Sequence, residues 1–196
     1  RAGRGPDQDR ICRIDHRIMT VKSILVYGNP LLEATNRPVE VFGDELQILI
    51  QDLFETGWKA PGLGVAAPQI GVNLRLATVD LSVGRDPEAR VVLANPEIIE
   101  SQGRTQLEEG CLSFPGLFTT IERPVALRVR AQDGQGQWQE MEAEGLFAQA
   151  VCHEVDHLDG VLLVHHLRGM KRRLFLRRVA KMRKLGVWPT TDEMMS

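Results

Sequence analysis

The segment HEVDH at residues 153–157 contains the residue types that hydrolases use to hold a divalent metal ion. If this segment is helical, His153 and His157 lie four residues apart and project from one face, so both imidazoles can bind the same ion. Glu154 then lies beside them and can act on water without binding the metal. A catalytic site of the zinc type has three protein ligands and one open position. The two histidines therefore require a third ligand from elsewhere in the chain.

The residues that follow His157 do not supply the usual third ligand. One known pattern places a glycine and then a histidine at fixed distances; Gly160 fits, but the histidine position is Leu163. A second solution takes a glutamate from a following helix, but no glutamate occurs between Glu154 and Glu193. Both patterns typical of zinc proteases are therefore incomplete.

Two other sources of the third ligand remain. His165 and His166 follow an apolar run, residues 161–164, that favours a strand, and at most one of them could return to the site. Cys111 lies upstream in EEGCLSFPG, residues 108–116, where glycine and proline fix the backbone and present the thiol at a bend. A thiolate with two imidazoles leaves a fourth position open and suits Zn²⁺ or Fe²⁺. We therefore favour Cys111.

The other cysteines have a different interpretation. Cys152 directly precedes His153, so on a helix it is rotated by about 100° from the metal face and is expected to pack in the core. Cys12, Cys111 and Cys152 are an odd number without a CxxC pair, which disfavours a disulfide framework. Reduced thiols favour a cytoplasmic location.

Hydrophobic periodicity predicts an α+β domain in which the helix that carries the two histidines packs against antiparallel or mixed β-sheets. Helices are expected over residues 42–62, 146–160 and 168–186. Asp44 is the expected cap of the first helix and Gly57 its end, while Gly160 is the expected stop of the second. Strands are expected over residues 74–82 and 89–100, and a hairpin over residues 125–145. The segment 62–71 is too rich in glycine for an ordinary strand or helix interior.

Length and composition fit one compact domain, because the chain has 196 residues and 43% of them are hydrophobic. We expect a catalytic domain over residues 19–186, a disordered leader or extension over 1–18 and a flexible tail over 187–196. Met19 is the expected natural start. No stretch approaches the roughly 18 to 20 apolar residues that cross a bilayer, and a formal net charge of -2 gives no reason to expect DNA binding. Neither a membrane nor DNA is an expected partner.

Three segments, taken together and in this order, resemble peptide deformylases: GLGVAAPQ at residues 62–69, EGCLS at 109–113 and HEVDH at 153–157. These hydrolases remove the formyl group from N-formylmethionine at the start of new bacterial and organellar proteins. The resemblance covers residues 23–185, and the three motifs together are far more specific than HEVDH alone. It implies a peptide deformylase-like fold and a metallo-amidohydrolase that releases formate.

The resemblance also implies the roles of individual residues. The implied metal ligands are Cys111, His153 and His157. A metal-activated hydroxide would attack the formyl carbon while Glu154 transfers the proton. Gln69 and the backbone N–H of Leu112 would stabilise the developing oxyanion. Fe²⁺ is the expected ion in cells, and Zn²⁺ or Ni²⁺ is expected to be accepted in purified protein.

The expected substrate-binding residues come from the same motifs. Gly62 and Gly64 lack side chains, so a peptide backbone can pair with this segment as an added strand; Gly64 is also placed with the catalytic residues. The family positions expected to contact the substrate and line a methionine pocket are Val65, Leu107, Gly110, Leu146, Gln149 and Ala150. Gln149 is unusually polar for such a wall. Arg123 is expected to hold either a structural carboxylate or a substrate carbonyl.

The last expected helix has nine Lys or Arg residues between Arg168 and Lys184 and no acidic residue. Such a charge run is usually a solvated face, but on an enzyme that acts on nascent chains it could dock on ribosomal RNA. The expected partners are N-formylmethionyl nascent chains in the bacterial cytoplasm rather than in an organelle. The rival functions are a metalloprotease and a non-catalytic protein with a structural metal, which would need a fourth ligand.

Overall fold

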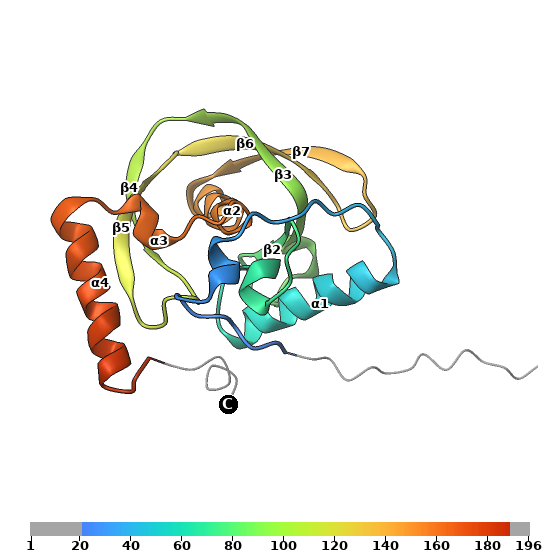
Figure 1. Ribbon diagram of the computed structural model, residues 1–196. Coiled ribbons are helices and arrows are strands. Elements are labelled where there is room, and N and C mark those ends of the chain that lie inside the picture. The colour runs from blue at the N-terminus through green and yellow to red at the C-terminus, as the bar shows by residue number, and fades with distance from the viewer. Residues whose placement is uncertain (1–20, 189–196) are drawn as a thin grey trace, which may run out of the picture.

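Helix α2 (Gly145–Leu158) lies at the centre of the molecule, with β-strands around it (Figure 1). The computed structural model describes residues 21–188. The predictions of a leader over residues 1–18 and of Met19 as the start lie outside the described residues, as does the predicted tail over 187–196 apart from Val187 and Trp188. The described part has the predicted α+β fold, with antiparallel sheets packed around the helix that carries both histidines.

The larger sheet has five strands in the order β1-β2-β3-β6-β7, each antiparallel to its neighbours. Its strands are β1 (Gly64–Ala66), β2 (Leu76–Asp80), β3 (Arg90–Gln102), β6 (Ala126–Gln132) and β7 (Trp138–Glu144). A second sheet pairs β4 (Thr105–Gly110) with β5 (Phe118–Arg123). The predicted strands and the predicted hairpin, now β6 and β7, are confirmed. Alternate residues of β6, namely Leu127, Val129 and Ala131, are buried, as expected for a strand with one face on the core.

Burial of an apolar face holds α2 in place. Its buried residues Ala148, Val151 and Leu158 pack in one cluster with residues of the larger sheet, and burying a leucine side chain contributes about 1.5–3 kcal/mol. Gly160 follows the helix with φ of +70°, and a Cβ there would lie 2.8 Å from the carbonyl oxygen of Glu33. Gly160 is therefore the predicted terminator, because other residues would be strained and would clash.

Helix α1 (Asp44–Lys59) corrects two details of the sequence analysis. Its N-cap is Gly43, and Asp44 is the first helical residue rather than the cap. The expected stop at Gly57 is wrong because the helix continues to Lys59. Gly57 is buried, and a Cβ there would lie 3.2 Å from Cγ2 of Val65 in β1. Its role is to let the helix approach the strand closely.

Two short segments also differ from expectation. Residues 62–71 contain the three-residue strand β1, which is an edge of the larger sheet, followed by the 3₁₀ turn η2 (Ala67–Ile70). The expected strand over 161–164 is wrong, because α3 (Leu163–His166) is a helical turn. A short apolar run cannot distinguish a buried strand from a buried helix. The remaining 3₁₀ turns are η1 (Pro30–Glu33) and η3 (Pro87–Ala89).

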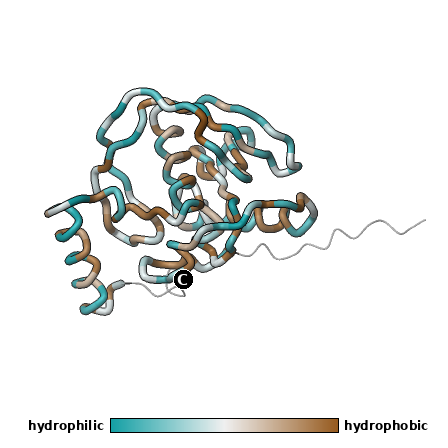
Figure 2. Tube along the Cα trace, turned by 45° about the horizontal axis from the view of Figure 1, so that its top comes forward, coloured by the Kyte–Doolittle hydropathy of each residue, from teal (hydrophilic) through white to brown (hydrophobic). Residues whose placement is uncertain are grey.

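Helix α4 (Gly169–Lys184), which the sequence predicted, lies at the edge of the molecule beside β5 (Figure 1). Hydrophilic and hydrophobic residues alternate along it (Figure 2). Phe175 and Val179 are buried in a cluster with Phe114, and Arg183 donates a hydrogen bond to the carbonyl oxygen of Tyr27. The helix is therefore anchored on the domain by its apolar side. No helix within residues 21–188 has the length and apolar character to cross a membrane.

Candidate metal centre

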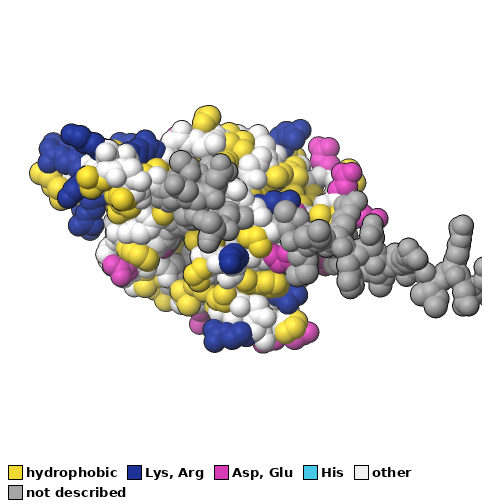
Figure 3. Space-filling model, turned by 90° about the horizontal axis from the view of Figure 1, so that it is seen from below, with side chains coloured by type: hydrophobic (Ala, Val, Ile, Leu, Met, Phe, Trp, Pro, Cys, Tyr) yellow, Lys and Arg dark blue, Asp and Glu magenta, His cyan; other side chains and the backbone are white. Residues whose placement is uncertain are grey.

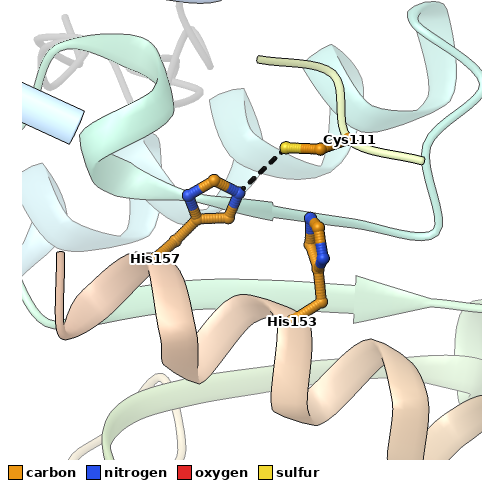
Figure 4. Close-up of side chains that lie close together, drawn as sticks. All are labelled: Cys111, His153 and His157. Atoms are coloured by element: carbon orange, nitrogen blue, oxygen red, sulfur yellow. Dashed lines mark hydrogen bonds between the residues drawn. The ribbon is translucent and has the colours of Figure 1, made fainter. Parts of the chain in front are cut away.

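The two histidines of α2 and the thiol of Cys111 meet at one point (Figure 4). Their ligand atoms all lie within 4.8 Å of one another. Sγ of Cys111 is 3.2 Å from Nε2 of His157. His153 and His157 project from the same face of α2, as their spacing predicts, and Cys111 directly follows the last residue of β4. The structure thus brings together the three residues that the sequence analysis selected.

The alternative ligands lie elsewhere. Nε2 of His165 is 3.1 Å from Oε1 of Glu33, and Nε2 of His166 is 2.7 Å from Oδ2 of Asp156. Cys152 is buried in the core, and burial raises its pKa to about 11. Its prediction as a packing residue is confirmed, because a buried neutral thiol behaves as a small apolar side chain.

A buried network of charges orients His153. Nδ1 of His153 lies 2.6 Å from Oε1 of Glu109, which leaves Nε2 directed toward the other ligands. Arg123 donates hydrogen bonds of 2.8 and 3.0 Å to Glu109 and forms an ion pair of 2.7 Å with Asp156. Burial acts to raise the pKa of Glu109, but the hydrogen bonds from His153 and Arg123 lower it to about 2. The expectation that Arg123 holds a structural carboxylate is confirmed.

The thiol of Cys111 is prepared to bind a cation. Its burial acts to raise the pKa, but the charges of His157 and His153 and their hydrogen bonds lower that pKa well below its usual value. The thiolate is the form of cysteine that binds metals. The site therefore favours the thiolate, while the same pairing raises the pKa of His153, so that binding of a metal ion would release a proton from the imidazole.

Glu154 lies in the wall of the adjoining cavity and is only 2% exposed. Burial raises its pKa to about 7, although His153 and His157 act in the opposite direction. Its Oε2 atom is buried and has no hydrogen-bond partner within residues 21–188. A buried polar atom without a partner costs free energy, and such groups are concentrated at functional sites. A carboxyl group with a pKa near neutrality can both take and give a proton.

Two hydrogen-bond donors lie beside the ligands. Oε1 of Gln69 accepts a hydrogen bond of 2.9 Å from the backbone of Ala66. This orients the amide nitrogen toward Cys111, at 3.8 Å from Sγ, and toward Ser113, at 3.3 Å from Oγ. Among the described residues, no acceptor takes a hydrogen bond from the backbone N–H of Leu112. Both donors lie beside the metal ligands; the N–H of Leu112 has no acceptor among the described residues, whereas the amide of Gln69 would exchange a present contact for a new acceptor.

A cavity of about 520 Å³ opens next to these groups. Of the predicted substrate-binding residues, it is lined by Gly62, Gly110, Leu146, Gln149 and Ala150, together with Gly64 from the catalytic set. Val65 is fully buried in a cluster with α1 residues, and neither Val65 nor Leu107 is part of the lining. Leu63, which sequence reasoning missed, lines the cavity instead. Strand alternation does not indicate this, because Leu63 precedes β1 and lies two residues from Val65, a spacing that would place both on one side.

The chemistry of the ligand set fits a divalent metal ion. One thiolate and two imidazoles are suitable donors for Zn²⁺ or Fe²⁺. The three groups leave a fourth position for water or substrate, as catalytic sites do and closed structural sites do not. The second hydrogen-bonding nitrogen of His153 is held by a carboxylate, which is the usual arrangement for a metal-binding histidine.

Comparison with known proteins gives a consistent result. The family model described as polypeptide deformylase matches residues 21–173. The peptide deformylase of Acidobacterium capsulatum is 45% identical over 170 residues, which are 87% of this chain and 100% of that protein. The peptide deformylase of Chromobacterium violaceum is 43% identical over 166 residues, 85% of this chain and 98% of that protein. A crystal structure of a peptide deformylase from Legionella pneumophila has a TM-score of 0.80 and 39% identity, and the match covers 87% of this chain and 100% of that one.

Proposed function

Since the chain belongs to the polypeptide deformylase family, we propose that its metal ion is bound by Cys111, His153 and His157. Members of this family are metal-dependent hydrolases that remove the N-formyl group from nascent peptides. The observation that carries the proposal is the convergence of the three ligand atoms within 4.8 Å of one another beside the cavity. An ion held there would polarise water and the formyl oxygen, which is the chemistry that a metal supplies in hydrolysis.

Glu154 is the group that moves the proton. It accepts a proton from the attacking water and delivers it to the nitrogen of the leaving amine, so the products are formate and a free amino terminus. The unpartnered Oε2 atom in the cavity wall supports the proton transfer, and burial raises the pKa of Glu154 against the lowering that a nearby cation would cause. A carboxyl group with an ordinary pKa would be a weaker acid-base catalyst near neutral pH.

Gln69 and Leu112 stabilise the negative charge that develops on the formyl oxygen. The side-chain amide of Gln69 is oriented by its bond to Ala66, and the backbone N–H of Leu112 lacks an acceptor in the described structure. A preorganised donor of this kind is worth roughly 3–4 kcal/mol in other hydrolases. Neither group adds a charge that would compete with the metal.

The substrate backbone pairs with the free edge of β1. This strand is at the end of the larger sheet and pairs only with β2 there. A Cβ at Gly62 would lie 2.9 Å from Cδ1 of Leu112, so the glycine allows the Leu112 side chain to pack against this segment. An extended peptide can add to such an edge while its methionine side chain enters the apolar part of the cavity.

An activity assay with a metal analysis tests the proposed function directly. Protein purified without oxygen is expected to contain about one divalent ion per chain and to release formate from a formyl-Met-peptide. The same protein should leave the internal amide bonds of an unformylated peptide intact. Cleavage of those bonds would favour the metalloprotease alternative, and bound metal without formate release would favour a structural ion.

Replacing Gly64 with alanine tests the position of Glu154. A Cβ at residue 64 would lie 2.5 Å from Oε1 and 2.8 Å from Cδ of Glu154, so the carboxyl group must move. A displacement of about 1 Å can lower a rate by up to about 100-fold, and we expect kcat for formyl-Met-peptide to fall roughly 10- to 100-fold with metal content unchanged. Gly43→Ala is the matched control, because the nearest atom to a Cβ there is 4.0 Å away. Parent-like kcat in Gly64→Ala would contradict the role of Glu154.

The metal in cells is proposed to be Fe²⁺, and the working location the bacterial cytoplasm. A thiolate with two imidazoles accepts Fe²⁺ or Zn²⁺, so the ligand set supports either ion. Cytoplasmic action is supported by the bacterial relatives and by the site of synthesis of formylmethionyl chains. Metal analysis of protein purified without oxygen would decide the identity of the ion.

Helix α4 is proposed to contact the ribosome. Its Lys and Arg side chains gather at one end of the molecule (Figure 3). Arg173, Arg177 and Lys181 are exposed and are spaced by four residues, so they form one outward stripe opposite the buried Phe175 and Val179. An anchored cationic helix can bind phosphate groups without rearrangement.

Charge reversal of this stripe is expected to weaken cosedimentation with ribosomes. The variant Arg173→Glu, Arg177→Glu, Lys181→Glu should bind more weakly and show a shallower salt dependence, by roughly 0.7–0.9 in log–log slope per lost phosphate contact. Deformylation of a free peptide should be unchanged. Charge reversal is preferable to removal of α4, because removal would expose the core around Phe175. Reversal of Lys59, Arg85 and Arg104, which are also exposed, is the control; equal loss in both variants would contradict the contact.

A further inference from the structure

Gln149 lies where the cavity wall meets the network that holds His153. Its side chain lines the cavity and is 8% exposed. Its Nε2 atom donates to the carbonyl oxygen of Glu108 at 3.0 Å and to Oε2 of Glu109 at 3.3 Å. We propose that Gln149 is a positioning residue, which acts on the metal centre through Glu109 and His153. The proposal rests on the assignment of His153 as a metal ligand.

The geometry of α2 connects Gln149 to the ligands. Residues 149, 153 and 157 are spaced by four and therefore share one face of the helix. The side-chain amide of Gln149 donates hydrogen bonds to residues of β4, and the other two residues are the histidines. One face of α2 thus makes a hydrogen bond to the strand that leads to Cys111 and also supplies the other two ligands.

The carboxylate of Glu109 accepts four hydrogen bonds, and the amide of Gln149 donates one of them. An ionised carboxylate has about four acceptor sites, two on each oxygen. Oε1 takes His153 and the Nη2 atom of Arg123. Oε2 takes the Nε atom of Arg123 and the amide of Gln149. Gln149 therefore fills the fourth site and opposes rotation of the carboxylate that orients His153.

The second hydrogen bond of the same amide restrains the backbone. It ends on the carbonyl oxygen of Glu108, three residues before Cys111. An apolar side chain would suit the cavity wall equally well, but it would release both Glu109 and this part of β4. The need for hydrogen bonds to Glu108 and Glu109 explains why a polar residue occupies the cavity wall.

A positioning role and a simple wall role predict different changes in Gln149→Met. Methionine keeps the unbranched shape of the side chain and removes both donors. Loss of a residue that orients a metal ligand directly costs about 10- to 100-fold in metal affinity; because Gln149 supplies one of four contacts, we expect release of Zn²⁺ to a chelator to become about three- to tenfold faster. The visible spectrum of the Co²⁺-substituted protein should change, and kcat should fall with KM within about twofold of the parent.

Leu146→Met is the matched control, since Leu146 lines the same cavity from the same helix. It should release Zn²⁺ at the parent rate, and any effect should appear in KM. Gln149→Leu provides a second variant without donors if Gln149→Met does not fold. Parent-like Zn²⁺ release and Co²⁺ spectrum in a folded Gln149 variant, with only KM raised, would overturn the proposal. Absence of deformylation in the parent would overturn the proposed function and leave the metal-release comparison valid.

Discussion

Replacing Glu154 with alanine is expected to lower kcat for formyl-Met-peptide hydrolysis by roughly 100- to 10,000-fold, the range that general acid-base groups contribute. The reason is that no other described carboxyl group combines burial in the cavity wall, a pKa of about 7 and an unpartnered oxygen. Metal content should remain about one ion per chain, because the three ligands are untouched. Formate release and metal analysis on the same sample provide the measurement.

Glu154→Gln is the companion variant because it keeps the size of the side chain and its contact with Gly64. It should lose as much activity as Glu154→Ala, since the amide can neither take nor return the proton. Substantial turnover in Glu154→Gln would show that the size of the Glu154 side chain matters and that its proton transfer does not. Loss of metal in both variants would instead show that Glu154 contributes to metal binding.

Replacing Cys111 with alanine is expected to abolish both metal binding and deformylation. The change removes one of three ligands and the negative charge that the two imidazoles stabilise. Two histidines alone would hold a divalent ion weakly, so the purified variant should contain little metal and release formate only at the background rate. Metal analysis, followed by an assay with and without added Zn²⁺, provides the measurement.

Cys152→Ala is the matched control for the loss of a thiol. Cys152 is buried one residue from His153 but lies outside the ligand cluster. This variant should keep its metal and its turnover. A Cys111→Ala protein with full metal and parent turnover would overturn the assignment of Cys111 as a metal ligand.

Much of the site could be predicted from the sequence because its parts lie on regular elements. A spacing of four residues on a helix fixes the relative direction of His153 and His157 whatever surrounds them. Cys111 was favoured because the residues after His157 do not supply the usual third ligand, and because a glycine and a proline flank it at a bend. The hairpin was predicted from the alternation of apolar residues in β6, whereas β2 is buried along its whole length and was indicated by its apolar composition.

The features that escaped prediction depend on contacts between distant segments. The glycine at position 57 predicts the end of a helix, but α1 continues through it. Its lack of a side chain lets the helix lie close to Val65. The apolar run 161–164 carries no period that separates a strand from a helix. Leu63 was missed because it precedes β1, outside the regular strand, where spacing does not fix the direction of a side chain. The roles of Glu109 and Gln149 required knowledge of how β4 meets α2.

The length of β1 has a consequence for self-association. An unpaired strand edge can pair with any extended chain, including another copy of the same protein, and this is a common route to aggregation. Strand β1 offers three residues, so an unanchored chain would gain few hydrogen bonds by pairing with it. A peptide whose first side chain is held in the cavity gains those bonds in addition to its anchor. The short edge therefore favours chain ends that fit the cavity and discourages aggregation through the same strand.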